Sequence, residues 1–270
     1  MQKHKHFPKA DRLSVISSVT LLAYAGMPFI HISAKAIRFS LFGFLIAFDL
    51  NFSLLISLIV AALAATGTDW LLHDHPALGS KNTLPYIITP TLTAWALGIP
   101  LSLIEISLEW WIVFGLGIIF IFAVLIAEYI AVDPSDTRFP AAVMLLTALS
   151  FGLFLTLSIS LRFTGLRLYM LLLVLLPAYA FVCLRILHLK ESSNWHLAWT
   201  AVCTVILAQF IIGLHYLPIS PIQFGLILLG PAYALISLAT AQINKKPLKN
   251  SIVEPIIMLG LFWIITAFFH

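Results

Sequence analysis

Residues 110–131 read WWIVFGLGIIFIFAVLIAEYIA, and Glu128 is the only charged residue among them. An α-helix needs ~20 consecutive, mostly apolar residues to cross the hydrocarbon core of a bilayer. The strands of a membrane barrel would instead alternate apolar and polar residues. Because this apolar run is unbroken, it predicts a transmembrane α-helix.

Runs of the same kind fill the rest of the chain. Of its 270 residues, 61% are hydrophobic and 10% are charged, and the mean hydropathy is +1.04. A soluble protein carries ~25% charged residues. We therefore predict an all-α, polytopic helical membrane bundle that forms one integral membrane domain over residues 1–270. In such a protein the net charge of +4 reflects the excess of lysine and arginine in cytoplasmic loops, so nucleic acid is not expected as a partner.

The sequence predicts about nine transmembrane helices. They cover Leu13–Ile32, Phe39–Thr66, Leu84–Ile104, Trp110–Ala131, Ala141–Leu161, Leu166–Leu187, Leu197–Leu217, Ile222–Ala241 and Ile252–Phe269. The second run is too long for one straight helix and carries Asp49 and Asn51 near its middle. Dividing it there would leave two pieces too short to span, so we expect one long or broken helix.

The lysines and arginines predict the orientation, because cytoplasmic loops are enriched in them. If the N-terminus is cytoplasmic, the inner basic residues are Lys3, Lys5, Lys9, Arg12, Lys81, Arg138, Arg185, Lys190, Lys245, Lys246 and Lys249, and the outer ones are Lys35, Arg38, Arg162 and Arg167. This asymmetry predicts a cell-membrane protein with its N-terminus inside and its C-terminus outside.

One short pattern occurs twice. Residues 172–184 read LLVLLPAYAFVCL and residues 226–238 read LILLGPAYALISL, with Pro-Ala-Tyr-Ala beginning at Pro177 and at Pro231. The echo favours duplicated hairpins over residues 166–217 and 222–270. The alternative is a chance match between apolar helices that draw on a small set of residues. A proline inside a helix cannot donate a backbone hydrogen bond, so both positions, and also Pro85, Pro90 and Pro100 in the third span, predict kinks or breaks.

The densest polar stretch is TGTDWLLHDHP at residues 66–76. On a continued helix, Asp69 and His73 share one face because they are four residues apart. With His75 they are candidate ligands of a divalent metal, and with Asp74 they are candidates for proton transfer. The alternative is a helix end followed by a solvated loop.

A second polar segment follows the fourth span. Glu128 lies in the last turns of that span, and a carboxylate there needs water, a cation or a basic partner. Asp133, Asp136 and Arg138 come next and are equally typical of a turn that caps the following helix. We expect Asp69, His73 and Glu128 to approach one another at the inner face.

No motif in the sequence specifies a reaction, so three classes of function stay open. The first is a polytopic integral membrane protein with no demonstrable catalytic motif, acting as a homo-oligomer or as a subunit of a membrane complex. The second is an enzyme that acts on a lipid or isoprenoid phosphate at the cytoplasmic face, with membrane lipid as its partner. Its candidate catalytic residues are Asp69, His73, Asp74, His75, Glu128, Asp133, Asp136 and Arg138.

The second class broadly resembles the aspartate-rich membrane prenyltransferases, which also combine a helical bundle with acidic cytoplasmic loops. The paired Asn/Asp-x-x-x-Asp motifs of that family are absent, and membership is not assigned. The third class is a small-solute or proton-coupled transporter, whose pathway would include Asp49, Asn51 and Arg185. Haem is not expected, because no haem-specific pattern accompanies His31 or His215.

Overall fold

A computed structural model describes residues 8–26, 35–41, 44–50, 52–79, 82–190, 195–245, 247 and 251–268. This part of the chain contains nine helices and one β-hairpin. The helices are α1 (Ala10–Gly26), α2 (Phe52–Leu72), α3 (Leu84–Leu103), α4 (Leu108–Ala131), α5 (Phe139–Phe163), α6 (Leu168–Lys190), α7 (Leu197–His215), α8 (Pro221–Ile243) and α10 (Val253–Ala267). The strands are β1 (Lys35–Leu41) and β2 (Phe44–Leu50).

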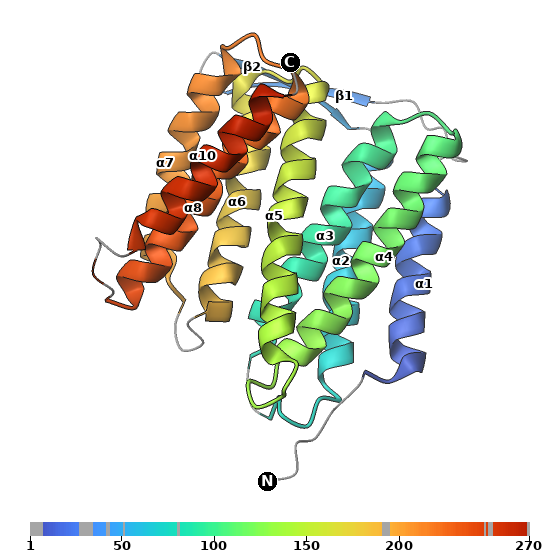
Figure 1. Cartoon of the computed structure of the whole chain (residues 1–270). Coiled ribbons are helices and arrows are strands. Elements are labelled where there is room, and N and C mark those ends of the chain that lie inside the picture. The colour runs from blue at the N-terminus through green and yellow to red at the C-terminus, as the bar shows by residue number, and fades with distance from the viewer. Residues whose placement is uncertain are drawn as a thin grey trace.

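The helices form an up-and-down bundle. In Figure 1 each helix runs opposite to the helix before it, and both α1 and α10 run upward. We call the end at which α2 ends and α3 begins the lower end. The connections α4–α5, α6–α7 and α8–α10 lie at this same lower end, so residues far apart in the sequence meet there (Figure 1).

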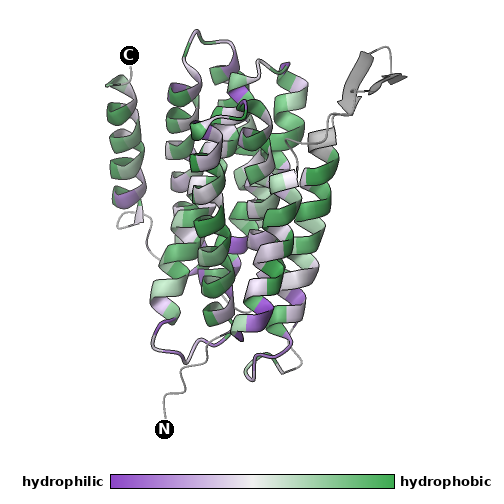
Figure 2. Ribbon diagram, turned by 90° about the vertical axis from the view of Figure 1, so that its right-hand side faces the viewer, coloured by the Kyte–Doolittle hydropathy of each residue, from purple (hydrophilic) through white to green (hydrophobic). Residues whose placement is uncertain are grey.

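The expected helical membrane bundle is confirmed. Seven of the helices, α2 to α8, are long and apolar enough to cross a membrane. Among the described residues, α1 has 17 residues and α10 has 15, so both fall short of the others. Hydrophobic residues make up most of the length of the helices, and hydrophilic residues gather towards the ends (Figure 2). Exposed apolar side chains such as Leu116 and Ile119 on α4, 61% and 66% exposed, suit contact with lipid.

The expectation of a single helix over Phe39–Thr66 is wrong. β1 and β2 form an antiparallel hairpin in which Ala36 pairs with Asp49, and α2 begins only at Phe52. The helix that remains has 21 residues and carries Asp69 as its only charge. A charged residue is costly at the centre of a transmembrane helix, so starting the helix after Asp49 removes that cost. Asn51 lies outside the described residues.

The prolines do not break the helices that contain them. Pro90 and Pro100 lie inside a continuous α3, and Pro85 lies in its first turn, where no backbone N–H is needed. Pro177 and Pro231 likewise lie inside α6 and α8.

The two copies of the repeated tetrapeptide lie in helices that run in the same direction, but they have different surroundings. The Tyr179 hydroxyl is buried and donates to the backbone oxygen of Ala232 over 3.1 Å. The hydroxyl of Tyr233 donates instead to the Glu254 carboxylate at 2.5 Å. The duplication of the hairpins stays a prediction.

The main core lies where α3, α5, α6, α7 and α8 meet. It contains Phe154, Tyr179, Leu207 and Phe224, all at most 1% exposed. Tyr179 contacts the ring of Phe154 with the centroids 5.4 Å apart. This core fixes α6 in the middle of the bundle, and α6 therefore places the side chains of its last turns beside those of α3 and α4.

Candidate functional site

A buried ion pair joins two helices near the lower end. Glu128 on α4 and Arg185 on α6 have side chains that are 0% and 1% exposed. Arg185 Nε donates to Glu128 Oε1 over 3.0 Å, and Arg185 Nη2 donates to Glu128 Oε2. This two-point geometry is the strong form of an arginine–carboxylate contact. Each charge is thereby compensated in a place that water does not reach.

Aromatic rings surround the arginine. The guanidinium carbon of Arg185 lies 5.0 Å from the ring centroid of Tyr86 on α3, which is a cation–π distance. The Tyr86 ring makes an edge contact with His188, at 6.5 Å between centroids, and His188 lies 5.7 Å from the ring of Trp195. Three segments, α3, α6 and the residues just before α7, therefore supply one cluster of rings around one cation.

A cavity of about 320 Å³ lies at this cluster. Its polar wall consists of Asn82, Tyr86, Arg185, His188 and Trp195. Arg185 Nη1 and His188 Nδ1 are buried and have no hydrogen-bond partner among the described residues. Asn82 Oδ1 already accepts the backbone N–H of Leu84 over 3.0 Å, which leaves the amide NH₂ for another partner. We name this cavity the arginine pocket.

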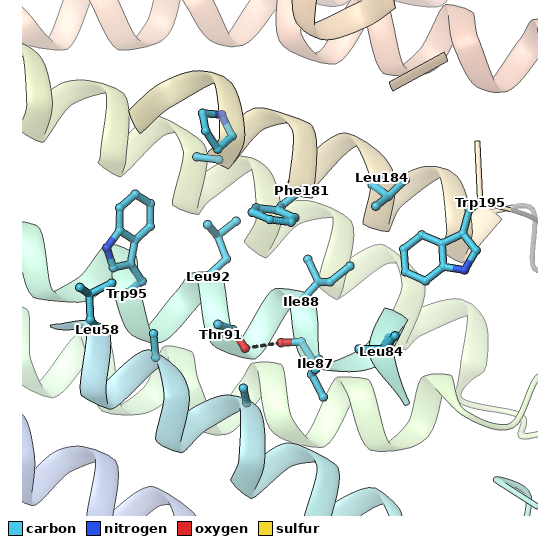
Figure 3. A pocket seen from close by; sticks show the side chains of 14 residues that line it. Leu58, Leu84, Ile87, Ile88, Thr91, Leu92, Trp95, Phe181, Leu184 and Trp195 are labelled. Atoms are coloured by element: carbon cyan, nitrogen blue, oxygen red, sulfur yellow. Dashed lines mark hydrogen bonds between the residues drawn. The ribbon is translucent and has the colours of Figure 1, made fainter. Parts of the chain in front are cut away.

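A second depression, apolar throughout, runs from the lower end along α2, α3 and α6. Its volume is about 550 Å³, and Figure 3 shows Leu92, Phe181 and Leu184 among the side chains that line it. Thr91 is also in the wall, but its hydroxyl donates to the backbone oxygen of Ile87 at 2.6 Å. Trp195 belongs both to this wall and to the wall of the arginine pocket. We name this depression the apolar groove.

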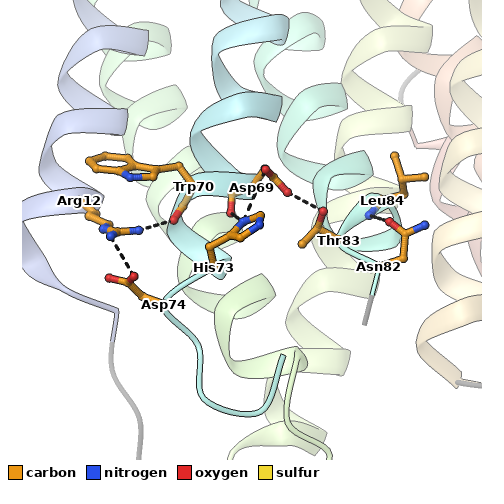
Figure 4. Close-up of polar contacts among 8 residues, drawn as sticks. All are labelled: Arg12, Asp69, Trp70, His73, Asp74, Asn82, Thr83 and Leu84. Carbon is orange, nitrogen blue, oxygen red and sulfur yellow. Dashed lines mark hydrogen bonds and ion pairs between the residues drawn. The ribbon is translucent and has the colours of Figure 1, made fainter. Parts of the chain in front are cut away.

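Asp69 and His73 meet as the sequence predicts, at the end of α2 (Figure 4). His73 Nδ1 lies 2.8 Å from the backbone oxygen of Asp69 and 3.5 Å from its carboxylate. Thr83 Oγ1, just before α3, donates to Asp69 Oδ1 over 2.5 Å. The carboxylate therefore holds the end of α2 to the start of α3.

Asp74 holds α1 in place. Lys9 Nζ and Arg12 Nη2 lie 2.9 Å and 2.8 Å from its carboxylate oxygens. Arg12 also donates from Nη1 to the backbone oxygen of Trp70 at 2.5 Å and lies over the Trp70 ring at 4.5 Å (Figure 4). The hydrogen bond from Lys9, together with the positive charge of Arg12, holds the pKa of Asp74 below its usual value.

Among the described residues, the third metal candidate, His75, does not form a metal-binding cluster with Asp69 and His73. His75 is 4% exposed and packs against the Tyr129 ring, with centroids 4.5 Å apart. Within the described ranges, no three His, Cys, Asp or Glu side chains lie close enough to hold a metal ion. Glu128 contacts Arg185 rather than Asp69 or His73, so the expected convergence of those three side chains is wrong. The metal and catalytic roles of the single residues stay predictions.

The loop between α4 and α5 adopts the turn of the alternative interpretation, but this turn does not cap α5, because the N-cap residue of that helix, Arg138, makes no side-chain capping hydrogen bond. Asp133 accepts from the backbone N–H and the hydroxyl of Ser135, at 2.9 Å and 2.7 Å, and the hydroxyl contact lowers the pKa of Asp133. Asp136 accepts from Arg138 Nε at 3.1 Å and Nη2 at 2.7 Å, and this contact raises the pKa of Arg138. Pro134, within this loop, lines the arginine pocket.

Asp49 and His215 lie outside this region. Asp49 is in β2, and its side chain is not among those described, so its role in an ion pathway stays a prediction. At the upper end, His215 Nδ1 lies 3.2 Å from Arg162 Nη1. His31 lies outside the described residues.

Fold and site together define a polytopic helical membrane protein with a charged pocket near one end of the bundle. The family model described as "Protein of unknown function (DUF5656)" matches residues 32–269. Because that match covers most of the chain, the protein belongs to this family. No curated protein and no solved structure gives a significant match to this chain.

Proposed function

We propose that this membrane protein binds an anionic ligand in the arginine pocket, with the lower end of the bundle facing the cytoplasm. The observation that carries the proposal is Arg185 Nη1, a buried donor of a cation that has no hydrogen-bond partner among the described residues. A buried polar group without a partner is costly, and a ligand that accepts its hydrogen bond removes that cost.

The other polar groups of the wall favour the same type of ligand. Asn82 contributes a free amide NH₂, Tyr86 a hydroxyl, and Trp195 an indole N–H, which can only donate. A wall that is rich in donors suits a group that is rich in acceptors, such as a phosphate or a carboxylate. Its volume of about 320 Å³ lies at the small end of the range for ligand pockets, ~300–1,000 Å³.

The cytoplasmic orientation is supported by the basic residues. Lys9, Arg12 and Arg138 lie at the lower end, whereas Arg162 and Arg167 lie at the upper end, between α5 and α6. Cytoplasmic segments of membrane proteins carry the excess of lysine and arginine.

A thermal-shift titration with inorganic phosphate tests the proposal on the purified full chain. We expect phosphate to raise the melting temperature of the wild type, since a ligand at ~100 times its Kd stabilises a protein by about 2.7 kcal/mol. The shift should shrink in Asn82→Ala and His188→Ala, which keep the ion pair intact. Arg162→Gln, a loss of one arginine at the opposite end, is the matched control. Equal shifts in all four proteins would contradict the proposal.

An enzyme acting on a bound phosphate is the second candidate, and His188 favours it. Its Nδ1 has no hydrogen-bond partner among the described residues, and its ring lies in the wall of the pocket between Tyr86 and Trp195. A histidine placed beside a phosphate can transfer a proton. Turnover of lipid phosphates by the wild type, and its loss in His188→Gln with phosphate binding retained, would support this candidate. Absence of turnover in the wild type would exclude it for the lipids tested.

A further inference from the structure

We infer that the ligand is a membrane lipid whose anionic head group lies in the arginine pocket and whose hydrocarbon chain lies in the apolar groove. This inference depends on the proposed function, because it assigns the chemical class of the ligand at the same site. It is carried by four features of the groove: its chemistry, its connection to the pocket, its length and its exposure.

The groove offers hydrocarbon only. Thr91, the one residue in its wall with a side-chain hydroxyl, uses that hydroxyl within its own helix at 2.6 Å (Figure 3). The methyl group of Thr91 is therefore left to contact a ligand, as are the apolar side chains of Ile88 and Leu92. The hydrocarbon of a lipid is as apolar as this surface, so an alkyl chain can lie against it without leaving an apolar environment.

The groove and the arginine pocket adjoin each other along two helices. On α3, Leu84 lines the groove and Pro85 lines the pocket. On α6, Leu184 lines the groove and Arg185 lines the pocket. Trp195 lines both and is 41% exposed, so one side chain lies at the boundary between the polar part and the apolar part. Tryptophan is enriched at the level of lipid head groups because its side chain combines an apolar ring with an N–H donor.

The length of the groove matches one leaflet of a bilayer. Its wall on α3 runs from Leu84, at the lower end, to Trp95. At a rise of 1.5 Å per residue these eleven steps cover roughly 16 Å. The hydrocarbon core of a bilayer is ~30 Å thick, so a single leaflet supplies about half of that. A chain anchored at the arginine pocket would therefore reach from the head-group level to the middle of the membrane.

The groove also opens on the outer surface of the bundle. Leu58 on α2 and Phe181 on α6 lie in its wall and are 51% and 49% exposed. A lipid could enter sideways from the membrane without passing through water. Arg185 Nη1, which has no hydrogen-bond partner among the described residues, offers such a lipid a donor that an anionic head group can accept. This donor would distinguish a specific anionic lipid from the general annular lipid.

Lipid retention by the detergent-solubilised full chain, measured by native mass spectrometry, tests this inference. The probes are phosphatidic acid, phosphatidylcholine with the same chains, and inorganic phosphate. Ala65→Phe fills the groove, and Ala201→Phe, on an exposed position of α7, is the matched control. We expect phosphatidic acid to bind more tightly than the other two probes. Ala65→Phe should weaken it by about tenfold, or ~1.4 kcal/mol, because the ring takes the place of part of the chain in the groove, and Ala201→Phe should not.

The outcomes distinguish the inferred lipid ligand from the proposed anion site on which it depends. If Ala65→Phe leaves the affinity for phosphatidic acid unchanged, or if phosphatidylcholine binds equally well, the inferred lipid ligand is wrong. Stabilisation by phosphate in the wild type, reduced in His188→Ala, would then still support an anion site. If neither phosphatidic acid nor phosphate binds, the proposed function itself fails. Retention of another copy of the chain in the groove, seen as a dimer that Ala65→Phe abolishes, would also overturn the inference.

Discussion

At the scale of single residues, Glu128 and Arg185 form the most deeply buried ion pair in the described part of the chain. Both charges are withdrawn from water, and each is tolerated only because the other compensates it. The sequence indicated that Glu128 needed a partner, and it also placed Arg185 near the same end. It could not pair them, because the contact depends on how α4 and α6 pack, and the two residues are 57 positions apart.

Removal of one partner should cost much more than removal of both. We expect Glu128→Leu or Arg185→Met alone to lower the free energy of unfolding by about 3–5 kcal/mol, because each leaves an uncompensated buried charge. The double variant should lie close to the wild type. Unfolding in mixed micelles measures all three, with Arg162→Met as a control. Additive effects of the two single changes would show that the residues are not coupled.

The contact between Asp74 and α1 should depend on pH in a defined direction. The pKa of Asp74 is lowered by Lys9 and Arg12, so the carboxylate contributes stability above its unfolded value of 3.8 and loses it as pH falls through the folded value. We expect hydrogen exchange in α1 to be constant from neutral pH down to about 5 and to increase below about 4, after correction for intrinsic rates. In Asp74→Asn, exchange should be faster at neutral pH and lack this additional acid dependence. A wild-type profile that matches the variant would contradict the assignment.

At the scale of elements, most helices could be predicted from the sequence because an unbroken apolar run of sufficient length has few alternatives in a membrane. The hairpin over Lys35–Leu50 could not. Apart from Lys35, Arg38 and Asp49 its residues are mostly apolar, and length and hydropathy alone do not distinguish an apolar strand from an apolar helix. The arginine pocket escaped prediction for a related reason. Asn82, Tyr86 and Trp195 are unremarkable in sequence and become a site only when α3 and α6 pack together.

A designed disulfide tests the hairpin. Ile37 pairs with Phe48 across the two strands. Residues directly opposite in an antiparallel ladder have Cα atoms ~4.5–5.5 Å apart, within reach of a disulfide. On a continuous helix the same two residues would be roughly 16 Å apart. We therefore expect the double variant Ile37→Cys/Phe48→Cys to form a disulfide under mild oxidation, in a chain in which Cys183 and Cys203 have been replaced by serine. Failure to crosslink, with both cysteines reactive, would favour the helix.

At the scale of the whole molecule, the bundle brings the basic loops and the arginine pocket to one end. The alternation of the helices follows from short connections, since neighbours joined by a few residues must run antiparallel. Because α1 and α10 run in the same direction, the start of α1 and the end of α10 lie at opposite ends of the bundle (Figure 1). The duplication of the α6–α7 and α8–α10 hairpins is compatible with this arrangement but is not required by it.

Reporter fusions test the proposed orientation. A reporter joined after Lys245, at the lower end, should be active on the cytoplasmic side, and one joined after Phe268 should be active outside. The physical reason is the excess of lysine and arginine at the lower end. A fusion after Leu217, between α7 and α8, serves as a second outer position. Activity on the same side after Lys245 and after Phe268 would contradict a crossing by α10, and activity outside after Lys245 would contradict the orientation.

Direct binding of radiolabelled phosphate to the Glu128→Leu/Arg185→Met double variant tests the central claim, that Arg185 is the ligand-binding cation. This variant is expected to keep the fold, because it removes both charges of the buried pair together. The account predicts saturable binding to the wild type, unchanged binding to Arg162→Met, and no binding to a folded double variant. Equal binding to the wild type and to the folded double variant would contradict it.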